Sequence, residues 1–113
     1  VHECDHRRTL TDLRKDFPFV DFREVKDEDD VLWTARKENE PSEMAATLCY
    51  ERADEFLNWL KNRPERNIAV VAHWVFLKHM FTAHAADPAL ATNFKNAELR
   101  TAALFSGGGK VEL

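Results

Sequence analysis

Five consecutive apolar residues, 68–72 (IAVVA), run directly into His73, and this run constrains the fold more than any other feature of the chain. A strand with one face in water alternates apolar and polar residues, whereas an unbroken apolar run is typical of a strand covered on both faces. Such strands occur in parallel sheets with helices on either side. The run therefore predicts a buried strand that ends at His73.

Helices are predicted on both sides of this strand. The first begins at Ser42, a good N-cap residue, and ends before Pro64. Its apolar positions follow one face of a helix and are Cys49, Ala53, Phe56, Leu57 and Leu60. The second covers residues 74–83 and is expected to bury Trp74, Leu77, Met80 and Phe81. These elements indicate that α/β layers form the fold.

The remaining segments complete a fold that looks only partly represented. Residues 9–16 read as a short helix, and residues 99–105 as a last strand. Residues 34–41 are polar and end in Pro41, which predicts a mobile loop, and residues 106–113 predict a flexible tail. Two strands are too few for a doubly covered sheet, which usually has about four to six. We therefore expect residues 1–113 to be part of one domain whose other strands come from elsewhere.

Composition narrows the class of protein. With 44% hydrophobic and 32% charged residues, the chain has the composition of an ordinary globular domain. The net charge of −4 argues against nucleic acid as a partner, and no apolar run is long enough for a membrane span. Cys4 and Cys49 form no CxxC pair, and no secretory signal opens the chain. Free thiols in a reducing compartment, and so a cytoplasmic location, are expected.

His73 is the main candidate for a functional residue. In open α/β sheets, ligands bind beyond the carboxyl ends of the strands, and a helix N-terminus at that position favours an anion. An imidazole there can donate a hydrogen bond to a phosphoryl oxygen. The alternative is a packed histidine at a strand end that binds a backbone carbonyl. Pattern alone leaves both interpretations open.

Other polar residues have weaker functional interpretations. Arg7 and Arg8 could reach a substrate phosphate from a lid, although surface arginines are the more frequent explanation. His2, Cys4 and His6 alternate, but no fourth zinc ligand with suitable spacing follows, so no metal site is predicted. A further set is expected to be structural or exposed: Glu98 and Arg100 as an ion pair, and His79 and His84 on an open helix face.

The segment 67–81 (NIAVVAHWVFLKHMF) resembles the second-histidine motif of the histidine phosphatase superfamily, which includes the phosphoglycerate mutase-like proteins. Shorter matches extend the resemblance over most of the chain to a cofactor-independent subgroup. They are CDHRR at 4–8, FP at 17–18 with DF at 21–22, DVLW at 30–33, RA at 52–53, FL at 56–57, WL at 59–60, RPE at 63–65 and NAELR at 96–100. Each match is weak alone, but the set in this order is quite specific.

The resemblance implies a three-layer α/β/α fold and phosphomonoester hydrolysis, or less favourably a mutase reaction, through a phosphohistidine. It makes His73 the second histidine of the phosphate pocket and lets the backbone N–H of Trp74 help to hold phosphate. The substrate would be a phosphorylated small molecule or a phosphoprotein, with no cofactor. The segment would be the C-terminal part of such a domain and would pack with an N-terminal half, a partner chain or itself.

Departures from the family pattern limit this expectation. The Arg-His-Gly motif of the attacking histidine does not occur in the 113 residues, and His6 is followed rather than preceded by arginine. Glu3 falls too late to match the family's acid, and Ala72 replaces a common serine. We therefore expect this segment alone to be inactive. The alternative is a non-catalytic structural or protein-interaction module derived from the same fold.

Overall fold

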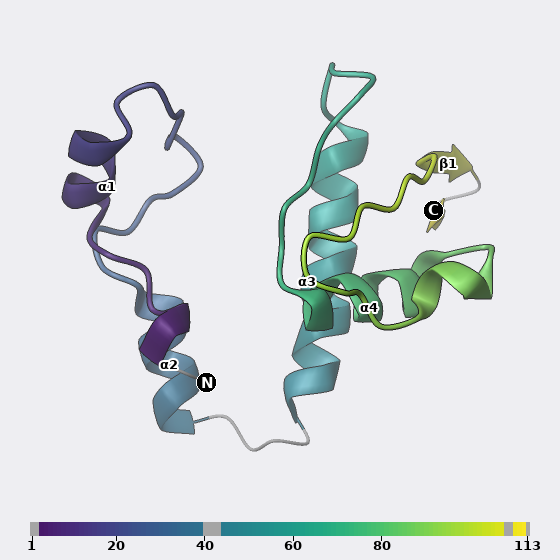
Figure 1. Ribbon diagram of the computed structural model, residues 1–113, viewed down its shortest axis with the longest axis horizontal. Helices are drawn as coiled ribbons and strands as arrows, with labels where there is room; N and C mark the ends of the chain where they lie inside the picture. Colours follow the sequence, from purple (N-terminus) through teal and green to yellow (C-terminus); the bar gives the residue numbers. More distant parts are fainter. Residues whose placement is uncertain (1–2, 40–43, 108–109, 113) are drawn as a thin grey trace. The chain divides into compact units, whose positions relative to one another are not determined.

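The computed structural model describes residues 3–39, 44–107 and 110–112, which form two compact units (Figure 1). The first unit comprises Val1–Pro41 and the second Ser42–Leu113. In the described part of the chain, no helix is both long and apolar enough to cross a membrane. The assignment of all 113 residues to one domain stays a prediction.

The first unit contains the 3₁₀ helix η1 (Glu3–Asp5) and the helices α1 (Leu10–Asp16) and α2 (Val31–Asn39). Helix α1 begins where the Thr9 hydroxyl accepts a hydrogen bond from the backbone N–H of Asp12, at 3.2 Å. Leu10 is buried, with 3% of its surface exposed. The helix predicted over residues 9–16 is thereby confirmed.

Helix α2 corrects the prediction of a loop over residues 34–41. The carboxylate of Asp30 accepts a hydrogen bond from the backbone N–H of Trp33 at 3.1 Å and caps the helix. The polar residues that follow include Arg, Lys and Glu, which favour helix when a cap is present. The polar stretch is therefore helical through Asn39, and residues 40–41 lie outside the described residues.

The second unit is built on two packed helices, α3 (Met44–Lys61) and α4 (Trp74–His84), with the 3₁₀ helix η2 (Pro88–Ala91) beside α4. Its most buried side chains are Ala53, Leu57, Met80 and Phe81. Partly buried residues surround them and are Phe56, Leu60, Phe76, Leu77, Ala85, Leu90, Ala91, Phe94 and Leu104. Both predicted helices are confirmed, although Ser42 lies outside the described residues.

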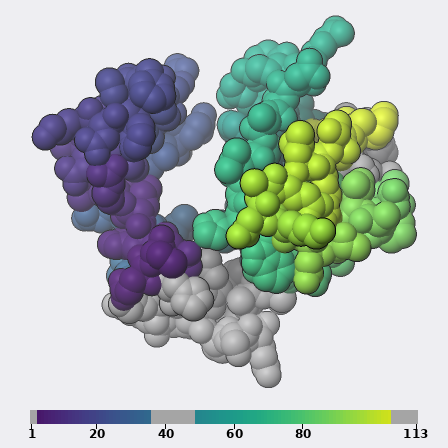
Figure 2. All heavy atoms as spheres, viewed as in Figure 1, coloured from purple at the N-terminus to yellow at the C-terminus, as the bar shows by residue number. Residues whose placement is uncertain are grey.

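The two predicted strands are wrong, and with them the three-layer α/β/α fold. Residues 68–72 and 99–104 belong to no strand in the part of the chain that the structure describes. A strand exists only through hydrogen bonds to a neighbouring strand, and the described residues pair neither segment. The apolar side chains consequently remain open, with Val71 99% and Leu99 87% exposed. Figure 2 shows residues 96–105, in yellow-green, at the surface of the second unit.

The described sheet is a short antiparallel hairpin near the end of the chain. Strand β1 (Phe105–Gly107) pairs with β2 (Lys110–Glu112), with Ser106 opposite Val111. Residues 106–107 and 110–112 take part in this hairpin, and the flexible tail that was predicted for residues 106–113 stays a prediction. Residues 108–109 and 113 lie outside the described residues.

Candidate functional site

His73 lies at the N-cap of α4, where its backbone carbonyl accepts the first helical hydrogen bond, from Leu77, at 3.1 Å. The residue is exposed, and its backbone is extended (φ −68°, ψ 141°). The imidazole makes no capping hydrogen bond to the helix. The ring is therefore neither sealed in the core nor used as a cap, and it can meet a ligand from solvent.

The start of α4 has the electrostatics of an anion site. The first backbone N–H groups of a helix, here those of Trp74 to Phe76, have no intrahelical acceptor, and the dipole of an 11-residue helix is positive at this end. A phosphate oxygen could accept from these groups and from the imidazole together. Trp74 is half exposed, at 46%, although it had been expected to be buried.

Aromatic contacts fix the first turn of α4 against α3. The ring of Phe56 meets the ring of Phe76 edge to face, with 6.0 Å between their centres. The guanidinium carbon of Arg52 lies 5.5 Å from the centre of the same Phe76 ring. Because Phe76 is only three residues after His73, these contacts hold the backbone that positions the imidazole. No periodic pattern of residues indicates the contact of Arg52 with Phe76.

His79 and His84 are more enclosed than predicted. The Nδ1 atom of His79 lies 2.7 Å from the carbonyl oxygen of Val75, and its ring meets Tyr50 of α3 edge to face. The Nε2 atom of His84 lies 2.6 Å from a carboxylate oxygen of Asp54, and 17% of its side chain is exposed. Both histidines therefore tie α4 to its surroundings, and the open helix face predicted for them is wrong.

Arg7 and Arg8 belong to the first unit, and both make structural contacts. The guanidinium of Arg7 donates to the backbone carbonyls of Arg8, Asp27, Glu28 and Asp29 at 2.7–3.1 Å. Arg8 forms an exposed ion pair with Asp16 at 2.7 Å. These contacts explain how the arginines are used within this unit, and a role in binding substrate stays a prediction.

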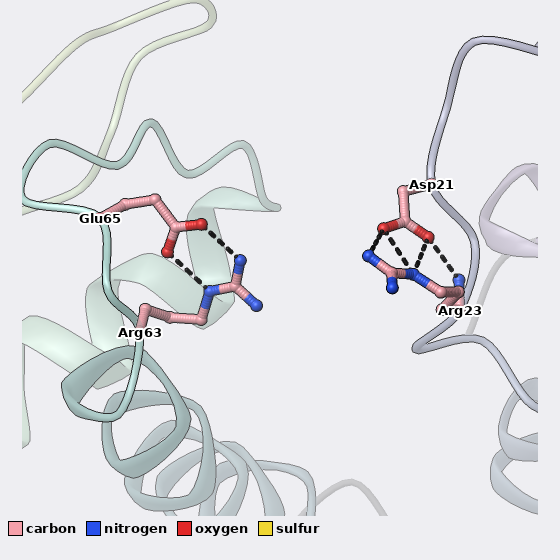
Figure 3. Close-up of polar contacts among 4 residues, drawn as sticks. All are labelled: Asp21, Arg23, Arg63 and Glu65. Atoms are coloured by element: carbon pink, nitrogen blue, oxygen red, sulfur yellow. Dashed lines mark hydrogen bonds and ion pairs between the residues drawn. The ribbon is translucent and has the colours of Figure 1, made fainter.

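Arg100 forms the ion pair with Glu98 that was predicted, at 2.7 Å. The pKa of the Glu98 carboxyl is lowered, and the largest cause is the hydrogen bond that Arg100 donates to it. A similar fork joins Arg63 and Glu65 after α3, with two hydrogen bonds of 2.9 and 2.6 Å (Figure 3). Both pairs stabilise turns of the second unit.

No metal site emerges from the described side chains. Among residues 3–35 and 49–105, whose side chains the structure describes, no three His, Cys, Asp or Glu side chains are grouped closely enough to hold an ion. His6 instead stacks on Trp33, with ring centres 4.3 Å apart, and the Sγ atom of Cys4 lies 3.8 Å from a carboxylate oxygen of Asp5. His2 lies outside the described residues.

Comparison with known proteins gives three significant relatives, all from Arabidopsis thaliana. Phosphoglycerate mutase-like protein 1 is 39% identical over 107 residues, which are 89% of this chain and 36% of that protein. Phosphoglycerate mutase-like protein 2 is 36% identical over 89% of this chain and 30% of its own length. A further phosphoglycerate mutase-like protein is 32% identical over 95% of this chain and 40% of its own length.

No family model matches the chain, and no solved structure matches it significantly. The chain spans between 30% and 40% of the length of the three curated relatives described above. The agreement nevertheless extends over nine tenths of these 113 residues, at identities of 32–39%. This chain belongs to the phosphoglycerate mutase-like family of the histidine phosphatase superfamily.

Proposed function

We propose that His73 is the second histidine of a phosphate pocket in a domain that hydrolyses phosphomonoesters, with a mutase reaction as the less favoured variant. The observation that carries the proposal is the exposed imidazole at the N-cap of α4, beside backbone N–H groups that lack intrahelical acceptors. The substrate is a phosphorylated small molecule or a phosphoprotein, and no cofactor takes part. A cytoplasmic location, favoured by free Cys4 and Cys49, belongs to the same proposal.

Each group has a defined task in this proposal. His73 donates a hydrogen bond to a phosphoryl oxygen, and its protonated form stabilises the negative charge that develops there. The backbone N–H of Trp74 contributes a second donor from the first turn of α4. The histidine that attacks phosphorus would come from an Arg-His-Gly motif, which these 113 residues do not contain. The acid that protonates the leaving oxygen would likewise come from outside these 113 residues.

The 113-residue chain alone is expected to show no turnover, because binding phosphate without a nucleophile produces no phosphohistidine. Hydrolysis of p-nitrophenyl phosphate by the purified chain should equal the buffer rate. Turnover that disappears in His73→Ala would contradict this expectation, since it would mean that the chain carries a complete catalytic site.

A segment exchange tests the catalytic role directly. This chain would replace the matching segment of Phosphoglycerate mutase-like protein 1, and hydrolysis of p-nitrophenyl phosphate would be measured before and after the exchange. Activity should survive the exchange and fall about 100-fold or more in His73→Ala, the usual cost of removing one donor to developing charge. Lys78→Ala, on the same helix, is the control and should retain activity.

A non-catalytic structural or protein-interaction module is the second candidate, because the Arg-His-Gly nucleophile is absent from these residues. The same exchange separates the two. If the relative hydrolyses the substrate before the exchange and a folded hybrid does not, the non-catalytic interpretation is favoured. If the hybrid is active and depends on His73, that interpretation fails.

A further inference from the structure

Arg52 of α3 brings a guanidinium to the first turn of α4. The two helices pack against each other (Figure 1), and the guanidinium carbon of Arg52 lies 5.5 Å from the centre of the Phe76 ring. Phe76 follows His73 by three residues, and side chains at this spacing are neighbours on a helix surface. Long side chains of a helix also lean back toward its N-terminus. The guanidinium is therefore placed beside the end of α4 that carries His73.

The contact with Phe76 leaves the hydrogen-bond donors of Arg52 available. A guanidinium carries five N–H donors, and attraction between a cation and an aromatic ring uses none of them as a conventional hydrogen bond. Arg52 is exposed, and within the described residues no hydrogen bond or ion pair is recorded for its guanidinium. The ring thus holds the guanidinium in place while its donors can turn to an anion.

The charges along the chain favour an anion at this position. Residues 66–86, which include His73 and all of α4, contain no Asp or Glu. Asp54, two residues after Arg52, contacts His84 at the other end of α4. The guanidinium and the positive end of the helix dipole therefore meet where no carboxylate of α4 offsets them. An anion beside His73 would be attracted by both.

We propose that Arg52 is a phosphate-binding residue of the site that includes His73, an inference that rests on the proposed function. Its guanidinium donates to the phosphoryl oxygens from α3, while the imidazole of His73 and the backbone N–H of Trp74 donate from α4. An arginine keeps its charge at every pH at which proteins work, whereas an imidazole titrates between about pH 5 and 8. Arg52 thus supplies a positive charge to the site even when His73 is neutral.

NMR of the nitrogen-labelled 113-residue chain during titration with inorganic phosphate tests the contact directly. The Nε–H signal of Arg52 should shift in a saturable way, with the same dissociation constant as the ring signals of His73, because one ion binds both. The Nε–H signal of Arg63, which Glu65 accepts at 2.9 Å, is the control and should not move. If His73 shifts and Arg52 does not, only this inference is overturned. If neither shifts, the phosphate site itself is overturned.

Substitutions separate direct binding from an effect that passes through Phe76. Arg52→Met keeps an unbranched stem against the ring but removes the charge and the donors, so the dissociation constant for phosphate should rise about tenfold or more. Arg52→Lys should restore part of the affinity, because it returns the charge without the planar fork. Phe76→Leu, which keeps Arg52, should weaken binding much less, while circular dichroism shows unchanged helix content.

Lys78→Met is the matched control, since it also removes one positive charge but lies further along α4. Its dissociation constant for phosphate should stay close to that of the parent chain. Equal weakening by Arg52→Met and Lys78→Met would mean that only the total charge matters. Equal weakening by Arg52→Met and Phe76→Leu would mean that Arg52 acts by packing. Either result would overturn the proposal.

Discussion

The guanidinium carbon of Arg100 lies 3.7 Å from the centre of the Phe94 ring, which in turn lies 5.8 Å from the ring of the buried Phe81. The same guanidinium donates to the backbone carbonyls of Leu90, Thr92 and Asn93 at 2.6–2.9 Å. One side chain therefore closes the loop after α4 onto the core of the second unit. The Arg100 side chain is 10% exposed, so these contacts are largely shielded from water.

Replacing Arg100 should destabilise the second unit strongly. Arg100→Ala leaves three carbonyls without their donor, and we expect a loss of about 2–4 kcal/mol in the free energy of unfolding. Arg100→Lys should recover little of this, because an ammonium cannot reproduce the planar fork. Urea denaturation measures both. Arg63→Ala, which removes a more exposed pair, is the control and should cost about 1 kcal/mol or less.

Arg7 and Arg8 form a matched pair in the first unit. Arg7 binds four backbone carbonyls, whereas Arg8 makes one exposed ion pair with Asp16. Arg7→Ala should therefore release the loop at residues 27–29, and amide hydrogen exchange there should accelerate clearly. Arg8→Ala should leave exchange in this loop nearly unchanged. Equal effects would mean that the carbonyl contacts of Arg7 do not hold the loop.

Asp30 should make the first unit sensitive to acid. Burial raises the pKa of its carboxyl, but the backbone N–H groups of Arg7 and Trp33 donate to it, and the net pKa lies below the ordinary value. The resulting stabilisation is complete above the unfolded pKa, about 3.9, and is lost as the pH falls through the folded pKa. Asp30→Asn should weaken this acid dependence of unfolding, followed by circular dichroism.

The neighbouring residue Asp29 gives the control for that measurement. Its carboxylate accepts no recorded hydrogen bond within the described residues. Asp29→Asn should therefore preserve the acid dependence of the parent chain. If both variants alter it equally, the cause is the general charge of the acidic loop and not the capping role of Asp30.

Ala97 is a position where glycine should stabilise the second unit. Its φ of 57° lies in the left-handed region, which costs an alanine roughly 1 kcal/mol. The turn is closed by a hydrogen bond from Glu98 N–H to the Lys95 carbonyl at 3.1 Å. Ala97→Gly should raise the free energy of unfolding by about 0.5–1 kcal/mol in urea denaturation. Ala102→Gly, with no left-handed backbone to relieve, should not.

The helices could be predicted from the sequence because their determinants are local. Ala53 and Leu57 recur at helical spacing and are buried together, and Thr9 caps α1. Helix α2 was missed although Asp30 is a good cap, because the polarity of the residues that follow was interpreted as a loop. The two strands were predicted wrongly for a different reason. The apolar run at residues 68–72 is typical of a buried strand, but it carries no information on whether a neighbouring strand is present to pair with it.

The candidate site was only partly predictable. His73 could be found because a histidine directly after an apolar run and before a helix is a local pattern, and its place at the N-cap of α4 fits that position. The contacts of Arg52 with Phe76 and of Arg100 with Phe94 join residues from different elements. No spacing rule predicts such contacts, because they depend on how α3, α4 and the following loop pack.

Phosphate titration of the folded chain, followed by NMR of the histidine side chains, tests the central role of His73 most directly. Inorganic phosphate should shift the ring signals of His73 in a saturable way. The ring signals of His79 should not change, because His79 lies more than one helix turn further along α4 and contacts the carbonyl of Val75. His73→Ala should abolish saturable binding. Signals of His73 that do not move, or that move no more than those of His79, would contradict a phosphate site at the start of α4.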